Sequence, residues 1–320
     1  MLPGKKRMYY SDKPLEMKEL KPAIYGWFLL TIIMVTLSGC WKNAGEDSLK
    51  HSVIWRISGN ELPGPSYLFG TVHLLDSNDL SLYPTILEQL KRSDVLVLEN
   101  DLSDPAYQRR ALAMAMMAHD SLDNILTPVQ YEELQAFFMD EFNFPVTALN
   151  KMKPFYLASL IAALDAGENS GSHEEQLLRV ARKEEKKIMG LASLEKETEI
   201  LAAIPIHEQV EYLFDEIGLY RNGQAEAIRK DIHRAYQQAD LTKIAGIIAA
   251  SLKDHPAVFK QLFIARNESW IPAMTDMMKK QSCFFAVGVG HLPGEKGLLR
   301  LLQSEGYKLV PVHKDFWFHD

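Results

Sequence analysis

Two histidines stand in the same local pattern at opposite ends of this 320-residue sequence. His73 closes the motif Gly70-Thr-Val-His73, and His291 closes Gly288-Val-Gly-His291, each after a short apolar run. An imidazole can bind a divalent metal or act as a general base near neutral pH. One Gly-x-x-His motif arises often by chance. Two in matching settings suggest a single site that takes one histidine from each end of the chain.

A glutamate ends the apolar run that follows the first motif. The segment from Asp94 to Glu99 has charged residues at both ends of a continuous apolar run, which predicts a buried strand. Side chains just beyond the carboxyl ends of parallel strands face the usual ligand crevice. There Glu99 could bind a metal, orient a histidine or activate water. The matching position after His291 holds apolar chain and Pro311, so the predicted site is asymmetric.

The elements that must position these residues are predicted first at the N-terminal side. Apolar, β-rich runs at 53–57 and 66–70, joined by the proline- and glycine-containing segment 60–65, predict a β-hairpin. We expect a helix over 83–92 and a strand over 95–98. A strand, helix and strand of this length predict a βαβ unit with neighbouring parallel strands.

The rest of the chain predicts helices, interrupted by one strand and closed by two. Residues 103–186 and 195–280 have mainly helical patterns, and 187–191 is expected to be a short strand. The second Gly-x-x-His block predicts strands before Gly288 and over 307–310. The expected fold class is α/β: a split, largely parallel sheet built from both ends of the chain, with a large helical insertion. We expect one domain over 53–320.

The N-terminal segment is expected to be a leader outside this domain. Residues 1–22 are net basic, and the apolar run from Ala23 to Leu37 is shorter than the roughly 20 residues that span a bilayer. Leu37-Ser-Gly-Cys40 resembles a bacterial lipobox, which implies cleavage after residue 39, lipidation of Cys40 and a tether over 40–52. Trp41 in place of Asp favours the outer membrane. The alternative is an uncleaved anchor. Both place the domain in the cell envelope, facing the periplasm.

The net charge argues against one class of partner, and the cysteine content limits disulfide formation. The formal net charge is −7, which argues against nucleic-acid partners. Cys283 is the only cysteine besides Cys40, so with Cys40 lipidated no internal disulfide can form. Cys283 lies in an apolar run and is expected to be a buried, small hydrophobic residue.

Other motifs with catalytic potential are incomplete. His207-Glu-Gln-Val-Glu211 lacks the second histidine of a zinc-protease motif, and His173-Glu-Glu is expected to begin a charged helix. The sequence has no nucleophile elbow, phosphate loop or Cys-x-x-Cys motif. His313 and His319 lie in a polar tail. Arg266-Asn267 lies in a helical pattern and by itself would be a solvated pair.

Four motifs together resemble the TraB/GumN family, which is related to the Tiki metalloproteases. They are Leu68-Phe-Gly-Thr-Val-His73, Val97-Leu-Glu99, Arg266-Asn267-x-x-Trp270 and Val287-Gly-Val-Gly-His-Leu-Pro-Gly294. The resemblance implies a compact α/β fold with His73, Glu99 and His291 in the site and Arg266 and Asn267 close to it. Gly70 and Gly288 would shape the motif turns around any bound cofactor. Tiki proteins are divalent-metal peptidases, so manganese, cobalt or zinc would be held by His73, Glu99 and His291.

The sequence departs from the family pattern at two positions. Family members commonly have Gly-Leu-Glu after the middle strand, where this chain has Gly190-Leu191-Ala192. They often have an aspartate near the start of the preceding helix, where this chain has His173. Glu195 is three positions late, and we expect it to face elsewhere. If either acidic residue matters, metal binding or activity would differ here.

Three functions remain open on the sequence alone. The first is a divalent-metal-dependent, peptidase-like hydrolase, in which a metal-bound water attacks a carbonyl and Arg266 and Asn267 stabilise charge. The second is a metal-free, esterase-like hydrolase in which a histidine is the general base and Glu99 orients it. The third is a non-enzymatic envelope protein that binds haem or a peptide; the broader group to which the resemblance points includes the haem-associated ChaN-type lipoproteins as well as erythromycin-esterase-like proteins. The substrate would be a peptide or small molecule, and the sequence does not indicate an oligomeric state.

Overall fold

The computed structural model describes the chain from Ser52 to Val312 with short gaps. The described ranges are 52–72, 75–76, 82, 84–102, 104–166 and 170–312. His73, the predicted leader with Cys40, and the tail with His313 and His319 lie outside them. The predictions about these residues therefore stay predictions.

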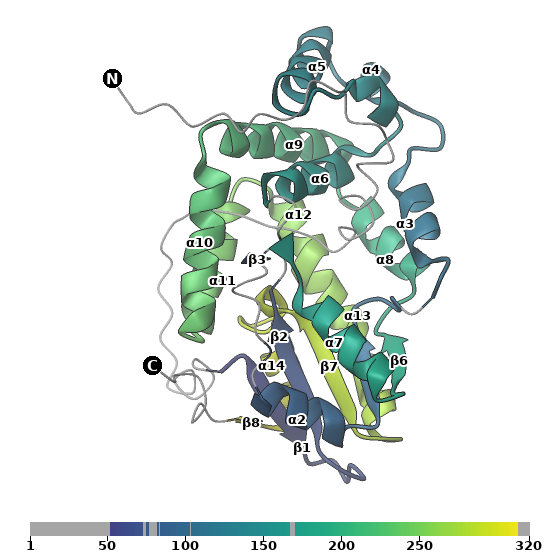
Figure 1. Ribbon diagram of the computed structural model, residues 1–320, viewed down its shortest axis with the longest axis vertical. Coiled ribbons are helices and arrows are strands. Elements are labelled where there is room, and N and C mark those ends of the chain that lie inside the picture. The colour runs from purple at the N-terminus through teal and green to yellow at the C-terminus, as the bar shows by residue number, and fades with distance from the viewer. Residues whose placement is uncertain are drawn as a thin grey trace.

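Short strands and many helices alternate along the described chain (Figure 1). The strands are β1 (Ile54–Ser58), β2 (Ser66–Thr71), β3 (Leu75–Asp76), β4 (Val95–Leu98), β5 (Ser170–Gly171), β6 (Lys187–Gly190), β7 (Cys283–Gly288) and β8 (Lys308–Pro311). The helices before β6 are α2 (Pro84–Arg92), α3 (Tyr107–Ala115), α4 (Leu122–Ile125), α5 (Pro128–Phe142), η2 (Val146–Leu149), α6 (Pro154–Ala166) and α7 (His173–Lys183). The helices after it are α8 (Leu194–Ala202), α9 (Ile206–Arg221), α10 (Gln224–Gln237), α11 (Leu241–Ser251), α12 (Pro256–Phe259), η3 (Lys260–Ala265), α13 (Arg266–Met278), η4 (Val289–His291) and α14 (Leu298–Ser304).

The main sheet confirms the expected α/β class and the contribution of both chain ends. Six strands pair in the order β6-β4-β7-β2-β1-β8, and β3 pairs with β5 in a separate two-stranded sheet. β2, β7, β4 and β6 are mutually parallel, and β1 is antiparallel to both β2 and β8. The predicted hairpin is therefore present. Its second strand contacts β7, which arrives from the far end of the chain.

One topological prediction was wrong. The strands on either side of α2 were expected to be neighbours, but β7 lies between β2 and β4. All residues of β2 and β4 are buried, and so is all of β7 except its last residue, Gly288. A strand that is apolar on both faces is stabilised at the centre of a sheet, where helices cover it. Local spacing predicted the parallel direction, and the long-range pairing decided the order.

Helices cover the sheet and form a layer beyond it (Figure 1). α7 packs on β4 and β6 and contacts α2, whereas α14 packs on β8 and α13. In Figure 1, α5, α6 and α9 lie at the upper end of the molecule, away from the sheet. α5 begins with a capping box: Thr127 accepts a hydrogen bond from the backbone N–H of Gln130, whose side chain accepts one from the Thr127 N–H.

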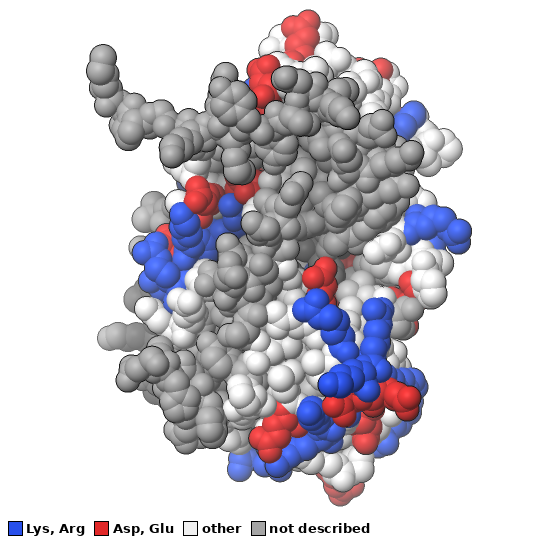
Figure 2. Space-filling view, viewed as in Figure 1, with Lys and Arg blue, Asp and Glu red and all other residues white. Residues whose placement is uncertain are grey.

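The charges on the face drawn in Figure 2 are of mixed sign. Blue and red side chains gather together over the lower part, where Figure 1 shows α2 and α7. Lys91 of α2 pairs with Glu184, the residue that directly follows α7, and Arg92 pairs with Glu88 within α2. None of the helices within the described ranges is long and apolar enough to cross a membrane.

Cys283 is a buried core residue, as predicted. It has no exposed surface and is a free thiol at the start of β7. Burial raises the pKa of the thiol to about 12, so it stays protonated at neutral pH.

Candidate functional site

Glu99 and His291 meet at the carboxyl ends of two adjacent strands. Glu99 directly follows β4, and His291 ends η4, the short 3-10 turn that directly follows β7. The two strands are parallel neighbours, with Leu98 opposite Ala286. The backbone N–H of Gly288 donates a 2.7 Å hydrogen bond to Glu99 Oε1, and His291 Nε2 lies 3.8 Å from the same oxygen. The predicted rim of the sheet therefore brings these two residues together.

Arg266 enters the site from the first residue of α13. The preceding segment η3 is π-helical, a rare geometry that is frequent at functional sites. Arg266 is only 1% exposed, so the expectation of a solvated side chain was wrong. Its Nη2 donates a 2.6 Å hydrogen bond to Glu99 Oε2, and its Nη1 lies 3.3 Å from His291 Nε2. One guanidinium thus contacts both residues that the strand ends supply.

Asn267 fixes the tautomer of His291. Its amide nitrogen donates to the carbonyl oxygens of His291 and Lys296, at 3.2 and 2.8 Å. These two bonds identify the amide nitrogen, so Oδ1 must be the atom 2.7 Å from His291 Nδ1. An amide oxygen can only accept, and Nδ1 therefore carries the hydrogen. In the neutral imidazole, the lone pair is on Nε2, the atom that faces Glu99 and Arg266.

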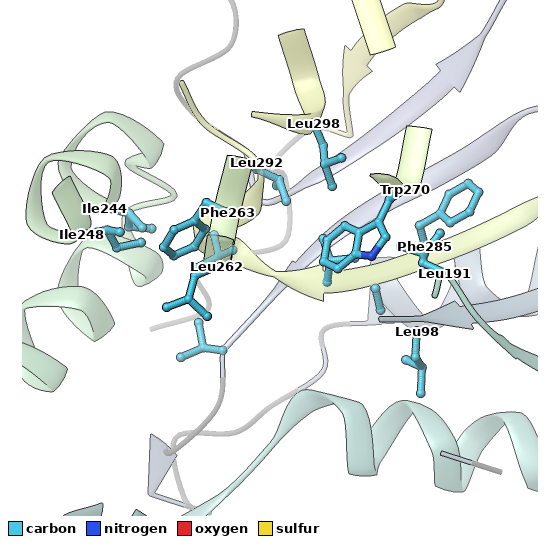
Figure 3. Packing of buried hydrophobic residues seen from close by; sticks show 14 of the residues in the cluster. Leu98, Leu191, Ile244, Ile248, Leu262, Phe263, Trp270, Phe285, Leu292 and Leu298 are labelled. Atoms are coloured by element: carbon cyan, nitrogen blue, oxygen red, sulfur yellow. The ribbon is translucent and has the colours of Figure 1, made fainter. Parts of the chain in front are cut away.

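Aromatic rings enclose the imidazole. The ring centroids of Trp270 and Phe263 lie 4.6 and 5.1 Å from that of His291. Trp270 is one helical turn after Arg266 and also contacts its guanidinium, with Cζ 4.7 Å from the ring centroid. Trp270 belongs to the same buried hydrophobic cluster as Phe285, Leu191 and Leu98, which Figure 3 labels. This apolar packing excludes water from one side of the site and strengthens the polar contacts there.

Two of the motif glycines, Gly70 and Gly290, are closely packed. A Cβ at Gly70 would lie 3.0 Å from side-chain atoms of Leu292 and Val289, and the Gly70 carbonyl accepts a hydrogen bond from Tyr236. Gly288 has ordinary dihedral angles, so it is not needed for an unusual backbone. A Cβ at Gly290 would lie 2.6 Å from Ile248 Cδ1 and 2.8 Å from Phe263 Cε1. In Figure 3, Phe263 and Ile248 lie side by side at this turn.

Sequence reasoning missed Glu197. This residue lies in the first turn of α8 and is 5% exposed, with Oε1 2.6 Å from Arg266 Nη2. Ala192, where the resemblance leads one to expect a glutamate, brings no carboxylate. Glu195 pairs with Arg110 at the surface, as predicted. A burial pattern of period 3.6 over 194–202 would have placed Glu197 on the buried face.

His173, the second departure from the family pattern, is also buried. Its Nδ1 accepts a 3.1 Å hydrogen bond from the backbone N–H of Val72, and its ring lies against those of Phe69 and Tyr236. The next residue, Glu174, is buried as well. The first residues of α7, which were expected to form a charged helix start, are therefore buried, and His173 lies against the end of β2.

The charged groups of the site shift one another's pKa values. Burial raises the pKa of Glu197, Arg266 opposes that shift, and Glu99 adds to it. Burial alone would lower the pKa of Arg266, but Glu197 and Glu99 reverse the direction and raise it. Burial and the charge of Glu197 also raise the pKa of Tyr107 and of Tyr156, so both phenols stay neutral. The cluster thus holds two carboxyl groups around one permanent cation.

The described donors supply part of a metal site. Glu99 Oε1 and His291 Nε2 are atom types that divalent metals accept, but Arg266 contacts both residues. No group of three His, Cys, Asp or Glu side chains within the described ranges is placed to hold a metal ion. The third ligand that the sequence suggests, His73, lies outside those ranges.

A groove of about 770 Å³ lies at the other end of the sheet. Its lining includes Pro65, Asp94 and Ser282, the residues that directly precede β2, β4 and β7. The groove is therefore at the amino ends of the parallel strands and is distinct from the site around His291.

Comparison with known proteins identifies the family and nothing finer. No curated protein and no solved structure matches the chain. The sequence profile of the TraB/PrgY/gumN family matches residues 53–311, which include both Gly-x-x-His motifs, Glu99, Arg266 and Asn267. Because this match covers most of the chain, the protein belongs to the TraB/PrgY/gumN family.

Proposed function

We propose that this protein is a cell-envelope hydrolase whose active centre is His291 with Glu99 and Arg266. The observation that carries the proposal is the imidazole held by Asn267 with Nδ1 protonated and Nε2 facing Glu99 and Arg266. A histidine whose orientation and tautomer are fixed by a neighbour is the arrangement that both general bases and metal ligands need. The described residues thus supply an imidazole, a carboxylate and a guanidinium within direct contact of one another.

The first form of the proposal is a divalent-metal-dependent, peptidase-like hydrolase. His291, Glu99 and His73 would hold the ion, which would lower the pKa of a bound water and supply the nucleophile. Asn267 Oδ1 accepts a hydrogen bond from Nδ1–H of His291, which keeps the lone pair on Nε2, the nitrogen that would bind the ion. Arg266 compensates the carboxylate charge and is positioned for negative charge that develops on the substrate carbonyl. The substrate class is a peptide or a small molecule with a hydrolysable carbonyl group.

A second form is a metal-free hydrolase, which one specific contact favours. Arg266 donates to Glu99 Oε2 while Gly288 N–H donates to Oε1, so both carboxylate oxygens are already paired. In this form His291 Nε2 takes a proton from water as the water attacks the carbonyl, and then returns it to the leaving group. Glu99 stabilises the imidazolium that forms, from a distance of 3.8 Å.

One set of measurements tests the proposal and separates its two forms. The protein from Trp41 onward is freed of metal and assayed on peptide and ester libraries, alone and with manganese, cobalt or zinc. We expect hydrolysis that His291→Ala lowers by at least about a hundredfold, the scale of a general acid–base contribution. The matched control is His255→Ala, because His255 is also buried against a carboxylate, Asp215, in the helical layer.

The outcomes assign the form. Activity that requires an added ion and disappears in His73→Ala supports the metal-dependent form. Activity that survives chelation supports the metal-free form. Equal activity in His291→Ala and the wild type would reject both. Haem binding without turnover of any substrate would point to a binding protein instead.

The location of the protein forms part of the proposal. The lipobox-like segment ending at Cys40 supports a lipid anchor in the envelope, with the domain facing the periplasm and the outer membrane favoured. Labelling of expressed protein with a radioactive fatty acid tests this, and Cys40→Ala should abolish the label. An unlabelled wild-type protein would contradict it.

A further inference from the structure

Arg266 is shared by two buried carboxyl groups that come from opposite sides. Nη2 donates a hydrogen bond to Glu99 Oε2 and makes an ion pair with Glu197 Oε1, both at 2.6 Å. Glu99 follows a central strand, whereas Glu197 comes from α8, after the edge strand β6. The guanidinium is thus held between the sheet and a helix that the sequence did not place in the site.

The geometry of α8 explains why only one of its acidic residues enters the site. Ser193 caps the helix by accepting a hydrogen bond from the backbone N–H of Lys196. Glu195 and Glu197 are two residues apart, so they point to nearly opposite sides of the helix. Glu195 meets Arg110 at the surface, and Glu197 is buried on Arg266. The two glutamates have the same side chain and lie in the same helical turn, and they differ only in the side of the helix from which they project.

The charge balance shows that Glu197 is not needed to neutralise Arg266. Glu99 alone would give the cluster a formal charge of zero, and Glu197 adds a second carboxyl group. Burying a further ionisable group costs free energy, so its presence here suggests a role other than charge compensation. The groups around it are the tyrosines Tyr107 and Tyr156, which stay neutral, and the Asn100 side chain, which lowers the Glu197 pKa.

The contacts of the guanidinium suggest that role. With Nη2 fixed between two carboxyl groups, rotation of the guanidinium plane is restricted, and Nη1 is left facing His291 Nε2 at 3.3 Å. Without Glu197, the hydrogen bond to Glu99, the contact of Nη1 with His291 and the contact with Trp270 would hold the plane, all on the side away from α8. The Glu197 contact is an ion pair, because Glu197 Oε1 makes no hydrogen bond, and its loss would remove the Coulomb attraction that holds Nη2 on the α8 side.

We propose that Glu197 is a positioning residue that locks the Arg266 guanidinium onto Glu99 and His291. Its role in turnover rests on the proposed hydrolase function, but the locking itself does not. Glu197 acts through Arg266 and contributes no atom to the reaction.

The locking is tested by nuclear magnetic resonance on protein with isotope-labelled arginine. Arg266→Lys identifies the Arg266 signals. We expect separate Nη signals in the wild type, because rotation about the Cζ–Nη bonds is slow, and rotation at least about tenfold faster in Glu197→Ala. Glu197→Gln keeps an acceptor oxygen and should fall between the two. Glu195→Gln, in the same helical turn, is the matched control and should leave the Arg266 signals unchanged.

The kinetic arm uses the same variants. Glu197→Ala should lower kcat by about 10- to 100-fold with little change in KM, the usual scale for residues that orient a functional group. Glu197→Gln should recover part of the loss. A purely structural role would lower the yield of folded protein but leave kcat per folded molecule unchanged.

Two results would overturn the inference, and they differ from failure of the hydrolase proposal. If the Nη groups of Arg266 rotate as slowly in Glu197→Ala as in the wild type, Glu197 does not lock the guanidinium. Faster rotation with unchanged kcat would show that the locking has no part in turnover. If no substrate is hydrolysed at all, the hydrolase proposal fails, and the resonance experiment still decides whether Glu197 holds Arg266.

Discussion

Two clusters in this protein, one fully buried and one partly buried, place carboxyl groups around an arginine, and only the buried one also includes a histidine. At the sheet, Arg266 contacts Glu99, Glu197 and His291. In the helical layer, Arg229 of α10 pairs with Asp165 of α6, and Glu216 of α9 is buried nearby. The two clusters have similar composition, so residue type alone does not separate a site from a structural ion pair.

The difference lies in what surrounds each arginine. Arg266 is 1% exposed and contacts an imidazole of fixed tautomer at the carboxyl ends of parallel strands. The Arg229 and Asp165 side chains are each 17% exposed, and Arg229 also donates to the Asp165 carbonyl oxygen, as a structural bridge between helices does. Water can reach the second cluster and relieve its charges. At the first, the protein itself must supply every compensating group.

The largest expected effect separates the two arginines. Arg266→Met leaves Glu99 and Glu197 buried without a cation, and we expect the free energy of unfolding to fall by about 3–5 kcal/mol. Arg229→Met should lower it by about 1 kcal/mol, because Asp165 can gain water. Urea denaturation of both variants measures the difference. Equal losses would show that the two clusters are energetically alike.

A pH-dependent effect is expected in the helical cluster. Burial raises the pKa of Glu216 from 4.5 to about 7, with Asp215 and Asp165 adding to the shift and Tyr212 and Arg229 opposing it. Between these values the folded protein binds a proton that the unfolded chain has lost. The contribution of Glu216 to stability therefore decreases as pH rises from about 4.5 to about 7.

The variant Glu216→Gln tests this directly. It should match the wild type near pH 4.5 and exceed its unfolding free energy above pH 7, by about 3 kcal/mol at about 1.4 kcal/mol per pKa unit. Urea denaturation at the two pH values measures the gap. A constant difference at both would contradict the shifted pKa and would place Glu216 in a less buried environment.

A smaller effect compares two buried amides, one in each region. Asn267→Ala removes the partner of His291 Nδ1, and kcat should fall by about 10- to 100-fold. Gln209 donates to the Ile204 carbonyl oxygen in the helical layer, so Gln209→Ala should affect stability and leave kcat unchanged. Steady-state kinetics of both variants separate the roles. A similar kcat loss in Gln209→Ala would mean that the assay reports folding rather than the site.

The smallest effect is expected at the surface. Glu195 is 54% exposed and pairs with Arg110, so Glu195→Gln should leave the unfolding free energy nearly unchanged. Its kcat should equal that of the wild type. A kcat loss comparable to that of Glu197→Ala would remove the distinction between the two faces of α8.

The sequence by itself determined the six strands of the main sheet, the largely parallel direction and part of the site. Apolar runs ending in Glu99 and in the second Gly-x-x-His motif predicted residues at strand ends, and the structure brings Glu99 and His291 together there. This succeeds because the pattern of a buried strand, and the position just beyond it, are local properties of the chain. The family resemblance added Arg266 and Asn267, which the residue pattern alone assigned to solvent.

The tertiary structure decided what depends on distant neighbours. Only the pairing of β7 between β2 and β4 shows which strand ends adjoin, since several strand orders are compatible with the same local pattern. Only the packing of α8 shows that Glu197, rather than position 192, brings the second carboxyl group to Arg266. A charged residue can be buried only where it meets a compensating partner. For Glu197 that partner is Arg266, which lies nearly seventy residues further along the chain, on another helix.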